Sequence, residues 1–532
     1  MKFSAVRAGF LAGAMALAAS QAHAQTAADL DGVFSRFSAA TPGCAVGLDR
    51  PGEPVLTRAW GLANLETGAA NTPDTVFESG SVAKQFTAAA VLMLAAEGRL
   101  NLSDDVRKHI PELWTYPTPV TIEQLLNHTS GLRDWGDVAQ LGGWPRTTRA
   151  YTNEEALSIA FRQRALNYVP GAEYSYNNTG YILAAEVVRR VSGRTLAQFS
   201  TERIFRPLGM DRTQWRDDFR RIVPGRATAY RAGPAQDMPF ENTYGHGGLL
   251  TTVSDLLTWN RALAEDRLAP GLYAQMQVQG VLTGGRRIAY ARGVQVEERL
   301  GRREVAHSGS TAGYRAWLAH YPAEKVSVAV LCNTAEADAV GLGRRVADFS
   351  IVPPAAAADV ASPTPPKELE VRPGVYLDEA TGQVGRIVRE NGTLRLTGGP
   401  LVYSEREARY RIGSDLVVFT AEGYERRRAD GDVSRFRRLT SHTHTPAEMT
   451  AAAGLYASDE AQATLRLSYW QGRLILQPAD RPSFRQTLEA LERDTFLVQG
   501  GVVRLVRNAQ GQVEALRFTT ARVRDLRFRR TR

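Results

Sequence analysis

Apolar and polar residues follow different periods on the two sides of a proline-rich tract. Before the tract, helical spacing, as at Val82, Phe86 and Leu94, is mixed with short apolar runs typical of strands. After it, short alternating runs are cut by Asn-Gly, Gly-Gly and Asp-Gly, which is typical of antiparallel β structure. The runs are Gly43–Leu48 and Val326–Leu331 before the tract, and Leu394–Leu396, Leu416–Phe419 and Leu474–Leu476 after it. The tract itself, residues 352–367, is rich in Pro and Ala without periodicity and is predicted to be a linker.

The region after the linker repeats itself at an interval of eighty residues. The matching segments are Gly374-Val375-Tyr376 with Gly454-Leu455-Tyr456, Asn391-Gly392-Thr393-Leu394 with Gln471-Gly472-Arg473-Leu474, and Gly431-Asp432-Val433 with Gly511-Gln512-Val513. Matches in one register predict two copies of a small β module, at 368–446 and 447–532. Each copy has the size of a small antiparallel β-barrel, whose closure removes exposed strand edges.

Residues 1–24 are predicted to be a secretory signal peptide. Lys2 and Arg7 lead the apolar run Ala8–Ala19, and Ala22-His23-Ala24 supplies a cleavage pattern after which the mature chain begins. The run is shorter than the ~20 residues that a membrane span needs, and no later segment approaches that apolar length. The sequence therefore predicts a periplasmic or secreted protein without a membrane span, whose first domain occupies residues 25–351.

Export places the two cysteines of the chain in an oxidising compartment. Cys44 and Cys332 each belong to a strand-like run. The sequence leaves two states open, a disulfide between them or two separate buried thiols, because it does not show their distance.

Composition excludes several classes of protein. The 532 residues exceed the roughly 250–300 that one core supports. Hydrophobic residues at 43% and charged residues at 23% are ordinary globular usage, which excludes a disordered or fibrous chain. The net charge is +9, and a nucleic-acid binder of this length usually concentrates far more charge in a patch. No nucleic-acid partner is therefore predicted.

Most of the net positive charge of the mature chain lies after the linker, where residues 368–532 hold 27 Arg, no Lys and 21 acidic residues. Near the end of the chain, Arg522, Arg524, Arg527, Arg529 and Arg530 alternate with Val523, Leu526 and Phe528. The pattern fits a basic face for a polyanion or membrane surface, or the solvated face of a final strand, which is the preferred interpretation. His442 and His444 are interpreted as loop residues, since no third ligand for a metal stands near them.

Candidate chemistry lies before the linker, beginning with a Ser-x-x-Lys quartet. The run Phe77–Leu100 has helical spacing from Ser81 onward and ends at Gly98, a typical helix cap. Ser81 is thus predicted at a helix N-terminus, whose N–H groups and dipole favour an oxyanion. Lys84 follows one turn later on the same side, which places a cation or amine beside the hydroxyl.

Two further motifs follow in order along the chain. The first is Tyr176-x-Asn178 before a helical pattern, and the second is His307-x-Gly309 in a strand-like run. With the Ser-x-x-Lys quartet, this order resembles the penicillin-recognising serine hydrolases, which include class C β-lactamases, D,D-carboxypeptidases, D-aminopeptidases and related esterases. Secondary markers over Leu125–Leu132 and Gly245–Trp259 agree with the resemblance. Within these, His128 is interpreted as structural, and His246 is left open as a residue of the cleft.

The resemblance implies an α+β fold and a role for each motif. The fold is an antiparallel sheet flanked by helices, with a mostly helical subdomain. Ser81 is the nucleophile that forms an acyl-enzyme, while Lys84 and Tyr176 share the proton transfers, and which of them is the base stays open. Asn178 would hold Lys84 and the substrate amide. Gly309 and Ser310 would border the substrate, with the backbone N–H groups of Ser81 and Ser310 as the oxyanion hole.

His307 departs from the Lys-Thr-Gly of most class C β-lactamases. Histidine is mostly neutral above its free pKa of ~6.5 and can instead donate or accept a proton. The His307-x-Gly309 motif resembles the His-x-Gly of D-aminopeptidases and some carboxypeptidases. The layout of one hydrolase domain followed by two β-barrels resembles that of bacterial D-aminopeptidases. In those enzymes a loop of the last barrel restricts substrate length. The candidate here is Gln477–Asp494, in which Asp480 would pair with the substrate ammonium.

The sequence as a whole predicts an exported serine hydrolase that acts on small peptides or amides containing D-residues, among them cell-wall peptides. D-aminopeptidase is preferred over D,D-carboxypeptidase. The alternatives are a promiscuous esterase or weak β-lactamase on the same fold, and a non-catalytic peptidoglycan- or peptide-binding protein. The sequence calls for no metal and no cofactor, and it leaves the oligomeric state open.

Overall fold

The structure is a computed structural model. It describes residues 28–146, 148–232, 235–351, 372–397, 399–404, 409–413, 415–428, 431–481 and 483–531. The predicted signal peptide and linker lie outside these residues. Two compact units take their described residues from Met1–Leu100, Val188–Val278 and Tyr290–Ala356 (unit 1) and from Asn101–Val187, Gln279–Ala289 and Ala357–Arg532 (unit 2). The predicted boundaries of the domains stay predictions.

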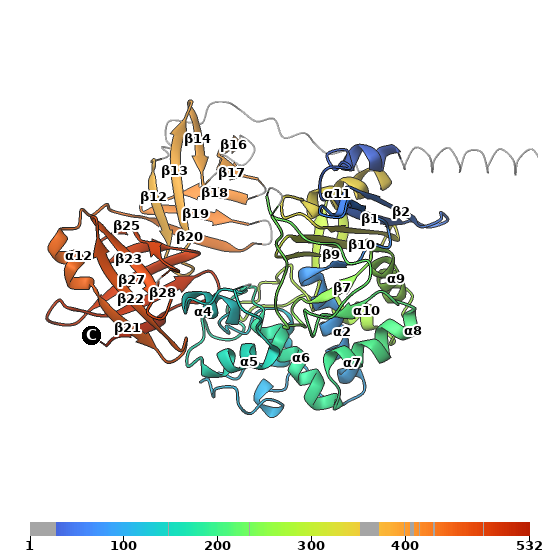
Figure 1. Ribbon diagram of the computed structural model, residues 1–532, viewed down its shortest axis with the longest axis horizontal. Coiled ribbons are helices and arrows are strands. Elements are labelled where there is room, and N and C mark those ends of the chain that lie inside the picture. The colour runs from blue at the N-terminus through green and yellow to red at the C-terminus, as the bar shows by residue number, and fades with distance from the viewer. Residues whose placement is uncertain are drawn as a thin grey trace, which may run out of the picture. The chain divides into compact units, whose positions relative to one another are not determined.

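A six-stranded antiparallel sheet is the centre of unit 1 (Figure 1). Its order is β2 (Leu56–Trp60), β1 (Cys44–Asp49), β11 (Val326–Cys332), β10 (Tyr314–Tyr321), β9 (Arg302–Thr311) and β8 (Gln295–Arg299). The two apolar runs of the sequence are the neighbouring strands β1 and β11, which pair from Cys44 opposite Cys332. Every residue of β11 is buried, which explains why its sequence reads as a continuous apolar run.

Smaller elements of unit 1 surround this sheet. They are the short strands β3 (Leu62–Asn64), β4 (Ala69–Ala70), β5 (Phe77–Glu78), β6 (Gln214–Trp215) and β7 (Leu249–Thr251), and the helices α2 (Lys84–Ala96), α7 (Leu196–Ser200), α8 (Arg206–Leu208), α9 (Val253–Ala264), α10 (Leu272–Met276) and α11 (Ala339–Ser350). Helices cover both faces of the sheet. A Cβ on Gly343 of α11 would lie 2.1 Å from Trp317, and a Cβ on Gly47 of β1 would lie 2.7 Å from Leu257 of α9. Trp317 lies opposite Val330, and Val330 lies opposite Val46, so Trp317 and Val46 point to the same face of the sheet. Gly47 follows Val46 in β1 and therefore points to the other face.

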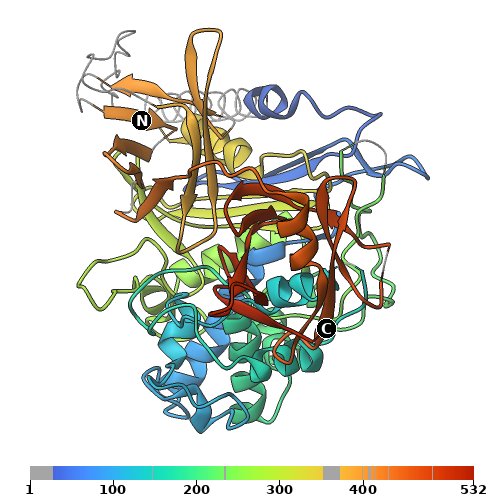
Figure 2. The same cartoon turned by 90° about the vertical axis from the view of Figure 1, so that its left-hand side faces the viewer.

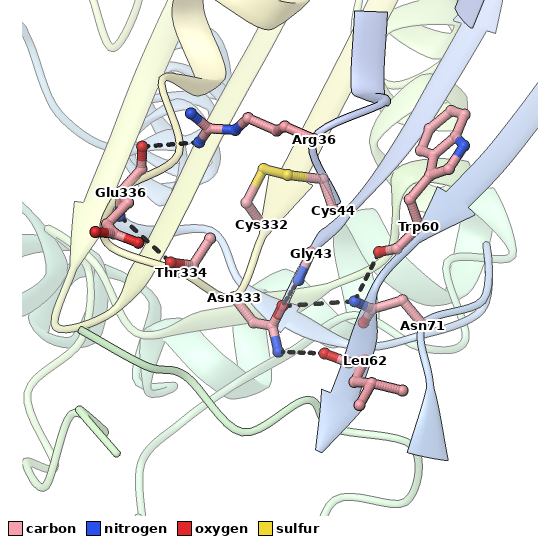
Figure 3. The surroundings of a disulfide bond; sticks show 10 residues. All are labelled: Arg36, Gly43, Cys44, Trp60, Leu62, Asn71, Cys332, Asn333, Thr334 and Glu336. Atoms are coloured by element: carbon pink, nitrogen blue, oxygen red, sulfur yellow. Dashed lines mark hydrogen bonds between the residues drawn. A yellow bond between two sulfur atoms is a disulfide. The ribbon is translucent and has the colours of Figure 1, made fainter. Parts of the chain in front are cut away.

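A disulfide joins β1 to β11 (Figure 3). Cys44 and Cys332 are 288 residues apart in the sequence, and both are fully buried. Beside them, the Asn333 carboxamide oxygen accepts from the Gly43 N–H at 2.8 Å, and its nitrogen donates to the Leu62 carbonyl at 3.0 Å. Of the two states that the sequence leaves open, the structure has the disulfide. A crosslink that closes so long a loop stabilises the fold mainly by restricting the unfolded chain.

Unit 2 contains a helical region and the C-terminal β region. Its helices are α3 (Ile122–Leu126), α4 (Trp135–Leu141), α5 (Asn153–Arg162), the first part of α6 (Thr179–Ser192), and α12 (Pro446–Ala452). Capping residues set their starts, since Thr121 and Thr152 form capping boxes and the Asp134 carboxylate accepts from the first turn of α4. No helix in the described residues is long and apolar enough to cross a membrane.

Two nine-stranded antiparallel sheets, each nearly closed and barrel-like, make up the C-terminal region (orange and red in Figures 1 and 2). Barrel 1 consists of β12 (Gly374–Asp378), β13 (Val384–Glu390), β14 (Thr393–Leu396), β15 (Gly399–Pro400), β16 (Val402–Ser404), β17 (Arg409–Ile412), β18 (Asp415–Phe419), β19 (Gly423–Arg427) and β20 (Val433–Arg438). Barrel 2 consists of β21 (Gly454–Ser458), β22 (Ala463–Trp470), β23 (Arg473–Pro478), β24 (Gln486–Thr487), β25 (Glu489–Glu492), β26 (Thr495–Val498), β27 (Gly501–Arg507), β28 (Val513–Thr520) and β29 (Leu526–Arg530). The predicted fold class is confirmed.

The two barrels share one strand order, displaced by nine strands, but the third sequence match does not fall on equivalent strands. Gly374 and Gly454 both open the first strand of a barrel. Gly431 lies between β19 and β20, whereas Gly511 lies between β27 and β28, one hairpin earlier in the order. The prediction of a constant interval is wrong for the second half of the repeat, because the connection from β23 to β25 is longer than that from β14 to β16.

Candidate active site

Ser81 lies in the turn that leads into α2. A 3-10 turn, η1 (Gly80–Ala83), precedes the helix, which begins at Lys84. Gly80 has a φ of +52°, a backbone conformation that residues with a side chain rarely adopt. It turns the chain from β5 into η1. Ser81 is half-buried between buried neighbours. The hydroxyl is therefore held on a tight turn at the start of a buried helix, where backbone N–H groups are free of helical partners.

The Lys84 side chain is fully buried and contacts Ser81. Its Nζ lies 3.1 Å from Ser81 Oγ and 2.6 Å from the carbonyl oxygen of His246. The turn that carries His246 is tied to α2, since the Thr87 hydroxyl donates to the Gly245 carbonyl at 2.7 Å. His246, which the sequence leaves open as a cleft residue, thus contributes its backbone oxygen, and that oxygen orients the amine beside the nucleophile.

Strand β9 lies directly against the nucleophile turn. A Cβ on Gly309 would lie 2.0 Å from the Ser79 carbonyl oxygen, and a Cβ on Gly80 would lie 2.6 Å from the Ser310 nitrogen. Only glycine fits at both positions, because no side chain tolerates such approaches to a backbone atom. The His-x-Gly motif therefore needs its glycine for packing, and the packing brings the Ser310 N–H next to the turn of Ser81.

His307 of β9 is a buried, neutral imidazole. Its Nδ1 lies 2.6 Å from the Ser308 carbonyl oxygen, which can only accept, so Nδ1 carries the hydrogen. Its Nε2 then accepts from the Tyr290 hydroxyl at 2.8 Å. Burial, and next the neighbouring Lys84 cation, lower the pKa of His307 to about 3. The imidazole is therefore oriented by two hydrogen bonds and provides no fixed positive charge, which favours a positioning role over proton transfer.

The lowered pKa makes His307 a source of acid sensitivity. The unfolded chain binds a proton near pH 6.5 and the folded chain only near pH 3, so the stability that neutral His307 allows is complete above pH 6.5 and is lost as the pH falls towards 3. We expect His307→Gln to lose less of its melting temperature between about pH 7 and about pH 4.5 than the unmodified chain. The control is His442→Gln, at a side chain that is 32% exposed. Equal losses in both variants would contradict the assignment.

A buried ion pair supports the strand before the nucleophile, and no sequence motif indicates it. Arg216 donates from Nε to one Glu78 oxygen at 2.8 Å and from a terminal nitrogen to the other at 3.1 Å. Both side chains are 1% exposed. Glu78 ends β5, so the pair fixes the position from which the chain enters η1. The residues are 138 apart, and charged residues in a sequence usually indicate surface.

Tyr176 and Asn178 belong to unit 2, in the segment before α6. The His128 ring centroid lies 4.2 Å from that of Tyr176, and His128 Nδ1 accepts from the Asn177 N–H at 3.3 Å. The Asn178 N–H donates to the Asp134 carboxylate at 2.6 Å. His128 and Asp134 thus shape the Tyr-x-Asn segment, in agreement with the structural role inferred for His128.

Asp480 lies in a different part of unit 2. It lines a cavity of about 730 Å³ together with Trp144 and Asp459. The neighbouring Arg481 guanidinium lies 3.9 Å from the Trp144 ring centroid and donates to the Gly143 carbonyl at 2.6 Å. The loop that carries Asp480 therefore packs on the end of α4. Tyr176 does not line the cavity of Asp480 but a different one. The ammonium-binding role of Asp480 stays a prediction.

The two histidines between the barrels contact each other, with ring centroids 4.6 Å apart, and the His442 ring lies 3.6 Å from Glu448. Across the residues that the structure describes, no group of three or more His, Cys, Asp or Glu side chains is arranged to hold a metal ion.

A serine hydroxyl with an amine beside it is the pairing that activates serine as a nucleophile, which places the chain among the serine hydrolases. A family model described as Beta-lactamase matches residues 28–352, and the chain belongs to this family. The enzyme class predicted from the motifs is therefore confirmed.

Relatives and solved structures agree with this assignment. A D-aminopeptidase of Gluconobacter oxydans (strain 621H) is 31% identical over 444 residues, which cover 80% of this chain and 82% of that protein. The octameric penicillin-binding protein homologue from Pyrococcus abyssi aligns with a TM-score of 0.52 at 19% identity, over 96% of this chain and 98% of that one. The D-amino acid amidase from Ochrobactrum anthropi SV3, complexed with L-phenylalanine amide, aligns with a TM-score of 0.52 at 22% identity, over 61% and 98%. The two structures show the shared fold.

Proposed function

We propose that the protein is an exported D-aminopeptidase, which releases an N-terminal D-residue from small peptides or amides through an acyl-enzyme at Ser81. The observation that carries the proposal is the 3.1 Å contact between Lys84 Nζ and Ser81 Oγ. Its direction towards D-residues comes from the likeness to the Gluconobacter D-aminopeptidase over most of both chains.

In the proposed reaction, Ser81 Oγ attacks the carbonyl carbon of the scissile amide. The serine proton passes to Lys84 in its neutral amine form or, where Lys84 is a cation, to the Tyr176 phenolate, and the same pair protonates the departing amine. Water then attacks the ester carbonyl and releases the D-amino acid, which restores the Ser81 hydroxyl. The backbone N–H groups of Ser81 and Ser310 are assigned to the oxyanion, in keeping with the close packing of Gly80 on Ser310.

The neutral state of His307 supports an amine-bearing substrate. A lysine at this place would offer a fixed cation to a substrate carboxylate and repel an N-terminal ammonium. The imidazole, held by Tyr290 and Ser308, does neither.

Export is supported by the signal-like pattern of residues 1–24 and by the disulfide, since structural disulfides are typical of oxidising compartments. Mass spectrometry of the protein recovered from the periplasm or medium tests it. A mature chain that begins at Gln25 is the expected result, and a full-length chain confined to the cytoplasm would refute export.

The substrate class is tested by comparing kcat/KM for D- and L-alanyl p-nitroanilide, D-Ala-D-Ala with a blocked N-terminus, a chromogenic cephalosporin and a short acyl ester. The proposal requires D-alanyl anilide to be preferred over its L-isomer and over the blocked peptide. Preference for the ester without D-selectivity would establish an esterase instead, and preference for the cephalosporin would establish a β-lactamase.

A further inference from the structure

A cavity of about 470 Å³ in unit 2 adjoins Tyr176. Its lining comes from three parts of unit 2: residues 172–176 and Arg286; Asp378, Ala380, Thr381, Gln383, Arg428 and residues 432–435 of barrel 1; and Ala521, Arg522 and Arg524 of barrel 2. Tyr176 acts at the scissile bond under the proposed function, on which this inference rests. The cavity beside it is then a place for a part of the substrate near that bond.

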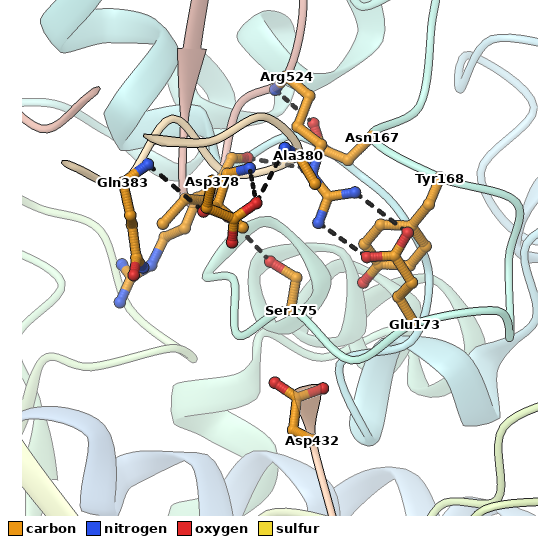
Figure 4. A network of polar contacts seen from close by, with 12 residues as sticks. Asn167, Tyr168, Glu173, Ser175, Asp378, Ala380, Gln383, Asp432 and Arg524 are labelled. Atoms are coloured by element: carbon orange, nitrogen blue, oxygen red, sulfur yellow. Dashed lines mark hydrogen bonds and ion pairs between the residues drawn. The ribbon is translucent and has the colours of Figure 1, made fainter. Parts of the chain in front are cut away.

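The loop between β28 and β29 is fixed on the helical region (Figure 4). The Arg522 carbonyl accepts from Asn167 Nδ2 at 2.9 Å and from the Asp134 N–H at 3.1 Å. The Ser175 hydroxyl donates to the Ala521 carbonyl at 3.2 Å. Ser175 directly precedes Tyr176, so the same contacts tie the loop to the Tyr-x-Asn segment. A backbone held in this way presents its side chain with little further loss of conformational freedom on binding.

The Arg522 guanidinium carbon lies 5.3 Å from the Tyr176 ring centroid, over its face, and the residue lines the cavity. Among the described residues, no carboxylate forms an ion pair with Arg522. Asp137 acts on it electrostatically while accepting from the Thr520 hydroxyl at 3.1 Å, and burial and then Asp134 raise the pKa of Asp137 to about 6.

The other arginines of the cavity each form an ion pair with a carboxylate, and Arg286 and Arg428 share Asp432. The pairs are Arg524 with Glu173 (2.8 Å), Arg286 with Asp432 (3.1 Å), Arg428 with Asp432 (3.2 Å) and Arg435 with Glu425 (3.0 Å). Figure 4 shows Arg524 turned towards Glu173. Arg522 is therefore the cation of this lining whose guanidinium is left for a ligand.

We propose that Arg522 binds a carboxylate of the substrate, so that the enzyme prefers short peptides whose leaving group carries a free C-terminal carboxylate. A planar guanidinium takes a carboxylate through two parallel hydrogen bonds, which gives orientation as well as attraction. The N-terminal ammonium of the same peptide is repelled by Arg522, so the cavity receives the leaving-group side. A C-terminal carboxylate lies close to the scissile bond only when the leaving group is one or two residues long.

The structure corrects one interpretation of the sequence. The basic alternation near the C-terminus fits a solvated strand only from Leu526 onward, where Leu526 and Phe528 are fully buried and Arg527 and Arg529 are exposed. Arg522 and Arg524 precede that strand and belong to the loop. Ala521, Arg522 and Arg524 line the cavity of Tyr176, whereas Asp480 lines another cavity, and the role predicted for the loop Gln477–Asp494 stays a prediction.

The test compares D-alanyl-glycine with D-alanyl-glycinamide, two substrates that share the scissile bond and differ in the terminal carboxylate. We expect kcat/KM of the unmodified enzyme to favour the free acid by about 10- to 100-fold, the range of one charge-assisted hydrogen-bonded pair. In Arg522→Gln the ratio should fall to about 1–3, chiefly through KM for the acid, because a neutral amide does not replace the guanidinium. Arg522→Lys should keep an intermediate ratio, and Arg529→Gln, at an exposed arginine of β29, should keep the full ratio.

The ratio separates this inference from the proposed function. No turnover of either D-alanyl substrate by the unmodified enzyme would refute the proposed function. Turnover of both without a preference for the acid would refute the role of Arg522 alone, as would a preference that survives in Arg522→Gln. A general loss of activity or stability in the variant lowers both rates and leaves the ratio readable, and Arg522→Lys supplies a second reading.

Discussion

Replacing Ser81 with alanine is expected to lower kcat/KM for D-alanyl p-nitroanilide by about 10³-fold or more, because the enzyme loses Ser81 Oγ, the atom that forms the acyl-enzyme. The same variant should not be labelled by a fluorescent penicillin that labels the unmodified enzyme. The fold should persist, since Ser81 is half-buried in a short turn whose packing depends on Gly80 and Gly309.

The measurement is in-gel fluorescence together with steady-state kinetics, with the melting temperature as a check on folding. Ser35→Ala, at an exposed serine of unit 1 whose hydroxyl donates to the Gly32 carbonyl at 3.0 Å, is the matched control and should keep full labelling. Labelling of Ser81→Ala at the level of the control would remove Ser81 as the nucleophile.

The parts of the site that could be predicted from the sequence are those encoded by short spacing. Ser81 and Lys84 are three residues apart at a helix start, so local geometry alone brings the amine to 3.1 Å from the hydroxyl. The contact from His246 could not be predicted, because a backbone carbonyl 162 residues away leaves no trace in the side-chain pattern. The same holds for Tyr290, whose hydroxyl donates to Nε2 of His307 from outside any motif.

The fold shows the same division. Apolar periodicity identified β1, β11 and the all-β character of the C-terminal region, since burial on a sheet face imposes a period on the sequence. The repeat was recognised from turns such as Gly392 and Gly472, which need positive φ angles of +80°. The interval of eighty residues fails in the second half of the repeat, because an insertion after β23 shifts the numbering without changing the strand order. Sequence spacing does not reveal on which strand a length difference falls.

The largest expected effect on stability comes from Arg216, whose loss leaves the Glu78 carboxylate in a buried setting without its bidentate partner. Arg216→Met is expected to lower the free energy of unfolding by about 3–5 kcal/mol, the cost of leaving one buried charge unpaired. Arg226, with a nitrogen 3.6 Å from Glu78, can offset part of this cost. Arg220→Met is the control, since Arg220 pairs with Asp218 at 3.0 Å but its side chain is 76% exposed, and its melting temperature should not change.

The double variant Arg216→Met/Glu78→Met separates charge from packing. A buried pair whose two members are both replaced by apolar side chains of similar size leaves no unpaired charge, so the double variant should be more stable than Arg216→Met alone. Urea unfolding of the unmodified protein, Arg216→Met, Glu78→Met and the double variant gives the coupling energy directly. If the losses in the free energy of unfolding of the two single variants sum to the loss of the double variant, there is no coupling and the ion pair does not hold β5. Because Glu78 ends the strand that enters the turn of Ser81, a coupled loss should also lower kcat in Arg216→Met more than in Arg220→Met.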